Sequence, residues 1–233
     1  MPCLLYCIMT APVAGGGPLT GVSGRPVSFV TAAGLGAAVA EVATVAHAPP
    51  VSELLAYGRV VAELYQRQPV IPMRYGGVLA DRPAVRRLLE ERRQPYAALL
   101  QELAGCCEMG IRIKLSEPVA AAAPAAPVTD GGGYLARRQA HYRRQEEHAQ
   151  QHQALLTCYI QAFAGLYRQH RTETATRDGG VVLSLFFLVP KDQATSFRET
   201  FQRVVEPEGA TTLISGPWPP YTFATRFTSH SNP

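Results

Sequence analysis

The segment from Glu117 to Gly133 most constrains the fold of this chain. It reads EPVAAAAPAAPVTDGGG and consists largely of alanine, proline and glycine. Proline lacks a backbone donor and glycine is conformationally free, so this composition is typical of a linker. We therefore expect two small domains, residues 1–117 and 134–233, joined by a linker over residues 118–133. A chain of 233 residues is long enough for two hydrophobic cores.

Apolar runs and helical patterns alternate in residues 1–117. Strands are predicted at Cys3–Met9 and Val27–Ala32, whereas Gly34–Val42 fits either a strand or a helix. A helix is predicted to begin with Ser52 as its N-cap and to end before Pro69. Its apolar residues at helical spacing are Leu54, Leu55, Val61 and Leu64.

The rest of this half continues the alternation. Val70–Ala80 is predicted as a strand bent by its proline and glycines, and Cys106–Leu115 as a half-buried strand. Between them, a helix from Asp81 to Gly105 is expected to kink or split at Pro95. This order indicates an α+β sandwich with helices over one sheet.

Residues 134–233 predict a second α+β domain. A long helix is expected over about Tyr134–His170, followed by a polar strand at Arg171–Arg177 and a buried strand at Val181–Val189. A turn at Asp178–Gly180 joins these strands. A helix from Pro190 and a last strand, ATTLISG, complete an α-β-β-α-β order.

The chain is mildly basic, with a net charge of +4, and only 17% of its residues are charged. Lysine occurs only at Lys114 and Lys191. A GC-rich coding bias and an arginine-rich binding face both account for the excess of arginine. The N-terminus lacks a basic signal region, and no apolar run reaches the length of a membrane span. A cytoplasmic protein without a membrane span is expected.

The cysteines and histidines do not form a known catalytic or metal-binding motif. The cysteine count is odd, at five, and no C-x-x-C pair occurs, which argues against a disulfide framework and a zinc ribbon. His141, His148 and His152 share the long helix, but the charged residues around them favour a solvated face. No metal, cofactor or catalytic residue is expected. A thiol nucleophile and a nucleic-acid-binding arginine helix remain as alternative functions.

The C-terminal stretch GPWPPYTF, Gly216–Phe223, is stiff and aromatic, and contains the single tryptophan of the chain. Its prolines exclude a helix interior or a central strand. We expect a strap that folds back onto the body of the protein at the seam between the domains, with Trp218, Tyr221 and Phe223 filling grooves. The alternative is an exposed proline-rich ligand for a partner.

Three stretches resemble the gas vesicle protein F/L family, GvpF/GvpL. VIPMRYGGVLAD resembles that family's VLPLRFGTVF segment, GPWPPYTF is similar to its TGPWPPYSF ending, and YLARR resembles the start of its central long helix. GLGAAVAEV and CEMGIRIKL fall where the family has apolar strands. The departures are Gly77, Met109 and Thr222, where threonine, an aromatic residue and serine are common in the family.

The resemblance implies a non-enzymatic accessory or minor structural protein of the gas vesicle. It implies the shell protein GvpA and other accessory gas vesicle proteins as partners, and a modified ferredoxin-like fold for the first domain. We expect Arg74 to need a structural partner, for which Glu108 is a candidate. The candidate partner-binding residues are Arg74, Tyr75, Gly76, Tyr134, Arg137, Arg138, Trp218, Pro219, Pro220 and Tyr221.

Overall fold

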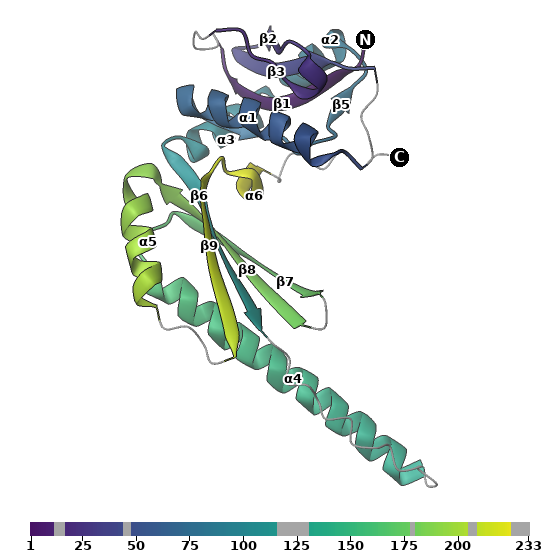
Figure 1. Cartoon of the computed structure of the whole chain (residues 1–233), viewed down its shortest axis with the longest axis vertical. Coiled ribbons are helices and arrows are strands. Elements are labelled where there is room, and N and C mark those ends of the chain that lie inside the picture. Colours follow the sequence, from purple (N-terminus) through teal and green to yellow (C-terminus); the bar gives the residue numbers. More distant parts are fainter. Residues whose placement is uncertain (12–16, 44–47, 116–130, 178–179, 205–208, 225–233) are drawn as a thin grey trace. The chain divides into compact units, whose positions relative to one another are not determined.

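The computed structural model describes residues 1–11, 17–43, 48–115, 131–177, 180–204 and 209–224 (Figure 1). The chain divides into two compact units. The first comprises Met1–Glu108 and Gly216–Pro233, and the second comprises Met109–Ser215. The segment from Gly216 therefore groups with the first unit, although the sequence assigned it to the second domain. Residues 118–130 of the expected linker lie outside the described residues.

The first unit is built on an antiparallel sheet with the strand order β2-β3-β1-β4, and β5 pairs with β1. Its strands are β1 Cys3–Thr10, β2 Ser28–Ala32, β3 Leu35–Glu41, β4 Val70–Pro72 and β5 Val78–Leu79. The segment that fitted either a strand or a helix is thus strand β3. The single strand expected over Val70–Ala80 is two short strands, with a turn at Gly76, where φ is +95°.

The helices of this unit are α1 Val51–Arg67, α2 Arg82–Glu91 and α3 Arg93–Leu103. The expected split near Pro95 is present, because α2 ends before Arg92 and Pro95 lies in the first turn of α3. Asp81 caps α2 as predicted, since its Oδ1 accepts a hydrogen bond from the backbone N–H of Ala84 at 2.7 Å. The N-cap of α1 is Pro50 rather than the predicted Ser52, which lies inside the helix.

The core of the first unit surrounds β1. Every residue of Cys3–Met9 is buried. Because successive strand residues point to opposite faces, both faces of this strand are covered. Helices α1 and α3 contact β1, and α2 contacts β2 and β3.

The second unit contains a four-stranded sheet in the order β7-β8-β6-β9. Its elements are α4 Gly131–Ala162, β6 Cys106–Leu115, β7 Gln169–Arg177, β8 Gly180–Pro190, α5 Ala194–Arg203 and β9 Ala210–Trp218. The sequence placed β6 in the first sheet, but β6 pairs with β8 and β9 instead. The long helix begins at Gly131, inside the expected linker, and ends at Ala162 rather than near His170. Residues 178–179 of the expected turn lie outside the described residues.

Three phenylalanines join the helices of the second unit to its sheet. Phe163, just after α4, stacks on Phe197 of α5 with ring centroids 4.3 Å apart. Phe187 of β8 lies 5.6 Å from the first ring and 5.2 Å from the second. All three are fully buried. The cluster therefore holds α5 and the end of α4 against β8.

Removing one ring of this cluster is expected to destabilise the second unit. Phe163→Ala should lower its free energy of unfolding by about 3–5 kcal/mol, because a buried aromatic leaves a cavity. Leu213→Ala, on a side chain that is 63% exposed, is the matched control and should change it by less than about 0.5 kcal/mol. Urea unfolding followed by circular dichroism measures both, and equal effects would contradict the assignment of Phe163 to the core.

Candidate functional site

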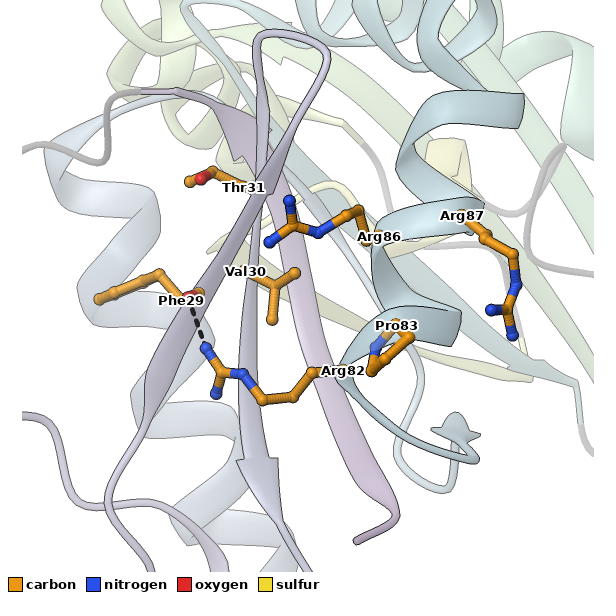
Figure 2. Close-up of a pocket in the computed structure, with 7 residues that line it drawn as sticks. All are labelled: Phe29, Val30, Thr31, Arg82, Pro83, Arg86 and Arg87. Atoms are coloured by element: carbon orange, nitrogen blue, oxygen red, sulfur yellow. Dashed lines mark hydrogen bonds between the residues drawn. The ribbon is translucent and has the colours of Figure 1, made fainter.

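A hollow of about 340 Å³ lies between strand β2 and helix α2 in the first unit (Figure 2). Residues of β2 line one side of the hollow, and a proline and arginines of α2 line the other. The residues that line it are Phe29, Val30, Thr31, Arg82, Pro83, Arg86 and Arg87. Such a mixture suits a ligand that offers both negative charge and extended apolar surface.

The three arginines of the hollow differ in what they contact. Arg82 is anchored on β2, where Nη1 donates to Ser28 Oγ at 2.7 Å and Nη2 donates to the carbonyl of Phe29 at 3.0 Å. Figure 2 shows Arg86 reaching across the hollow towards β2, whereas Arg87 points away from it. Both of these side chains are exposed. Arg86 is thus the guanidinium placed to meet a ligand in the hollow.

The sequence patterns did not indicate this hollow. The one sequence pattern that belongs to the hollow is the pair Arg82 and Arg86. These residues are four positions apart on one helix and therefore lie on one face of it. Periodicity does not say which strand lies opposite that face. The hollow arises because α2 packs beside β2, a contact between segments more than 50 residues apart.

Tyr75, a predicted partner-binding residue, lies in a structural cluster. Its hydroxyl donates to Glu53 Oε2 at 2.8 Å, and its ring meets the edge of Tyr57 at 5.4 Å. Tyr57 stacks on Tyr6 at 4.8 Å and donates to the carbonyls of Leu5 and Met73 at 2.8 and 2.9 Å. Burial and the hydrogen bond to Glu53 raise the pKa of Tyr75 to about 12. Tyr75 therefore ties the β4–β5 connection to helix α1.

Arg74 does not pair with Glu108. Its side chain is exposed. Glu108, which is 7% exposed, instead accepts hydrogen bonds from Thr222, at 2.7 Å from the backbone N–H and at 2.9 Å from the hydroxyl. The expected pairing is wrong because the C-terminal segment occupies this carboxylate. Arg74 therefore does not support the fold through Glu108.

The C-terminal segment folds back onto the body of the protein, as the strap hypothesis predicted, and its described contacts are with the first unit. Its expected place at the seam between the domains stays a prediction. Pro219 and Pro220 are buried, Phe223 is 2% exposed, and helix α6, Tyr221–Ala224, contacts β4. Burial, together with the nearby Cys7 and Glu108, raises the pKa of Tyr221. Trp218 departs from the prediction, since 56% of it is exposed. The segment thus combines a docked part with an exposed indole.

The predicted residues of the long helix α4 are only partly described. The side chains of Tyr134 and Arg137 lie outside the described residues. Arg138 is exposed and donates to the hydroxyl of Tyr142 at 3.4 Å, with its guanidinium 5.7 Å from the centroid of that ring. Among the described residues, no group of three or more His, Cys, Asp or Glu side chains could hold a metal ion.

The thiols are mostly buried. Cys3, Cys7, Cys106 and Cys107 are buried thiols that form no disulfide, and Cys158 is an exposed one. Burial raises the pKa of Cys7 well above its ordinary value, which disfavours the reactive thiolate. In the part of the chain that the structure describes, no helix has the length and apolar character needed to cross a membrane.

A row of apolar side chains lies on the surface at the start of α1. Val51, Leu54 and Leu55 are 70%, 43% and 56% exposed. Their spacing places them on one side of the helix. The helical spacing predicted for Leu54, Leu55, Val61 and Leu64 is present in α1, but of these four side chains only Val61 and Leu64 are buried. Exposed apolar side chains grouped in this way are typical of a contact surface.

Comparison with known proteins identifies the family. The family described as "Gas vesicle synthesis protein GvpL/GvpF" matches residues 2–225. The chain belongs to the GvpL/GvpF family. The resemblance found in VIPMRYGGVLAD and GPWPPYTF is therefore confirmed, and the protein has a role connected with gas vesicles.

Individual members of the GvpL/GvpF family are similar over most of the chain. Gas vesicle protein L of Streptomyces sp. is 33% identical over 187 residues, covering 72% of this chain and 67% of that protein. Gas vesicle protein L2 of Halobacterium salinarum is 25% identical and covers 94% of this chain and 90% of its own length.

The crystal structure of GvpF from Anabaena sp. PCC7120 has the same fold, with a TM-score of 0.75 and 16% identity over 96% of this chain and 95% of that chain. GvpF from Microcystis aeruginosa gives a TM-score of 0.73 with 16% identity, covering 96% of this chain and 98% of that chain. The predicted α+β class with two sheets is confirmed.

Loss of the Glu108 carboxylate is expected to release the C-terminal segment. In Glu108→Ala, two donors of Thr222 lose their acceptor, which costs about 1–3 kcal/mol for a buried group. Chymotrypsin should then cleave native protein after Tyr221 and Phe223 at least about tenfold faster. Glu91→Ala, on an exposed carboxylate of α2, is the control. Equal cleavage of both variants would show that Glu108 does not anchor the segment.

The raised pKa of Tyr75 predicts a loss of stability in alkali. Because the folded-state value of about 12 lies above the ordinary value of 10.0, the contribution of Tyr75 is complete below pH 10 and is lost as the pH rises towards 12. The melting temperature should fall over this interval, and less steeply in Tyr75→Phe. Tyr142→Phe, on a ring that is 50% exposed, should follow the wild type. Identical slopes for both variants would contradict the assignment.

Proposed function

We propose that this protein is an accessory protein of gas vesicle assembly that binds the shell protein GvpA and acts in the cytoplasm at the growing vesicle. Membership of the GvpL/GvpF family across residues 2–225 supports a gas vesicle role. The binding step is supported by one feature above all, the exposed apolar row Val51, Leu54 and Leu55. A shell protein that faces gas has an apolar surface, which needs cover before assembly.

The chemistry of this apolar row suits temporary binding to the apolar surface of the shell protein. The three side chains bury apolar area when a partner arrives, and each fully buried leucine or valine contributes about 1.5–3 kcal/mol. Arg59 is exposed on the same helix, and Arg74 is exposed between β4 and β5. Guanidinium groups near an apolar contact provide planar hydrogen bonds that orient the partner. Neither interaction requires turnover.

Other functions receive less support from the described residues. A thiol enzyme needs a thiolate, and burial raises the pKa of both Cys3 and Cys7. A nucleic-acid-binding helix needs a uniformly basic face, but the exposed Glu146 and Glu147 lie beside Arg143 on α4. Further accessory gas vesicle proteins are proposed as partners by the family resemblance.

The proposal predicts that a charge in the apolar row abolishes binding of the shell protein. Co-expression with GvpA followed by affinity purification should retain GvpA on the wild-type protein and at least about tenfold less on Leu55→Glu, because burying an unpaired carboxylate is costly. Gln66→Glu adds the same charge at another exposed position of α1 and is the matched control. Failure of the wild type to retain soluble GvpA would reject the function, and equal retention by both variants would reject the surface.

A further inference from the structure

Strand β2 is an edge of the sheet in the first unit. The strand order β2-β3-β1-β4 leaves β2 paired only with β3 among the described strands. An edge strand presents backbone N–H and C=O groups that another strand can pair with. The hollow of about 340 Å³ lies against this strand.

The backbone geometry identifies which groups face outward. Ala33 and Gly34, with φ of 51° and 81°, form a two-residue turn between β2 and β3, so Ala32 and Leu35 are a hydrogen-bonded pair. Pairing alternates along an antiparallel ladder, so Phe29 and Thr31 direct their N–H and C=O groups away from β3. The hydrogen bond from Arg82 to the carbonyl of Phe29 agrees with this alternation.

The groups at this edge differ in whether they are already used. The carbonyl of Phe29 already accepts a hydrogen bond from Arg82. Within the described part of the chain, the N–H and C=O of Thr31 take part in no hydrogen bond outside the β2–β3 ladder. Thr31 itself is exposed. One complete donor and acceptor pair is therefore open on the edge of β2, one residue before its last residue, Ala32.

The positive charge of the arginines beside this edge indicates which side chains suit a strand that pairs with β2. Arg82 and Arg86 are four residues apart on α2, a rise of about 6 Å, and alternate residues of a strand are separated by about 6.6 Å. Two carboxylates at alternate positions of a strand therefore match the two guanidiniums. The described residues contain no ion pair that involves Arg86. Its charge is free to meet an incoming carboxylate.

We propose that the edge of β2 binds an extended, acidic segment of a partner protein as an added strand. Thr31 exchanges backbone hydrogen bonds with the segment, and Arg86 binds a carboxylate on the face towards α2. Arg82 keeps its contacts with β2 and lies beside a second carboxylate two residues further along. This site is separate from the apolar row on α1, and it does not depend on the identity of the shell protein as the partner.

The test uses the full chain and a synthetic peptide, fluorescein-labelled Thr-Val-Glu-Val-Glu-Val-Thr, followed by fluorescence anisotropy. Its glutamates lie on one face of a strand. Arg86→Gln is expected to weaken binding about tenfold or more, since it removes a charge-assisted hydrogen bond. Arg87→Gln removes the same charge one residue away, from a side chain that points out of the hollow, and should change the affinity by less than about twofold. Both positions are exposed, so both variants should keep the wild-type melting temperature.

Two further measurements separate an added strand from general electrostatic attraction. A peptide methylated on the backbone nitrogens that face β2 keeps its charge but should lose binding. Hydrogen exchange at the Thr31 amide should slow at least about tenfold when the unmodified peptide is bound. Equal losses for Arg86→Gln and Arg87→Gln, undiminished binding of the methylated peptide, or no binding at millimolar peptide would each overturn the proposal. The assay contains no shell protein, so its outcome is independent of the proposed function.

Discussion

The complete burial of β1 is the constraint on which the first unit depends. Cys3–Met9 are buried on both faces, so the strand needs pairing partners on both edges and cover above and below. Strands β3, β4 and β5 provide the pairing. The hydroxyl of Tyr57 on α1 binds the carbonyl of Leu5 on this strand and that of Met73 beyond β4. The positions of α1 and of the β4–β5 connection follow from this central strand.

The C-terminal segment is fixed on the first unit by side-chain hydrogen bonds rather than by pairing with its sheet. Glu108 binds both donors of Thr222, and the prolines before it leave few backbone donors to satisfy. Trp218 is held beside this docked part with most of its surface exposed. An ordered but exposed indole contributes contact area at a low entropic cost, because the backbone that carries it is already fixed.

Local patterns predicted much of the secondary structure but less of the site. The alternation in Cys106–Leu115 predicted strand β6, yet the sheet that β6 joins depends on β8 and β9, which follow much later in the sequence. The helical spacing of Leu54 and Leu55 predicted α1 correctly but did not indicate that both side chains are exposed near the start of the helix. The hollow at Arg86 required the packing of α2 beside β2, which no local pattern encodes.

The sequence alone determined the α+β class, the split of the helix near Pro95, and the family, because each follows from residues that are close together in the chain. Periodicity and proline chemistry act over a few residues, so they can be read without coordinates. Only the tertiary structure decided that Glu108 binds Thr222 rather than Arg74, that Trp218 is exposed, and that β2 is an edge beside the exposed guanidinium of Arg86. These features depend on which distant segments meet, and that is decided by the burial of apolar surface over the whole unit.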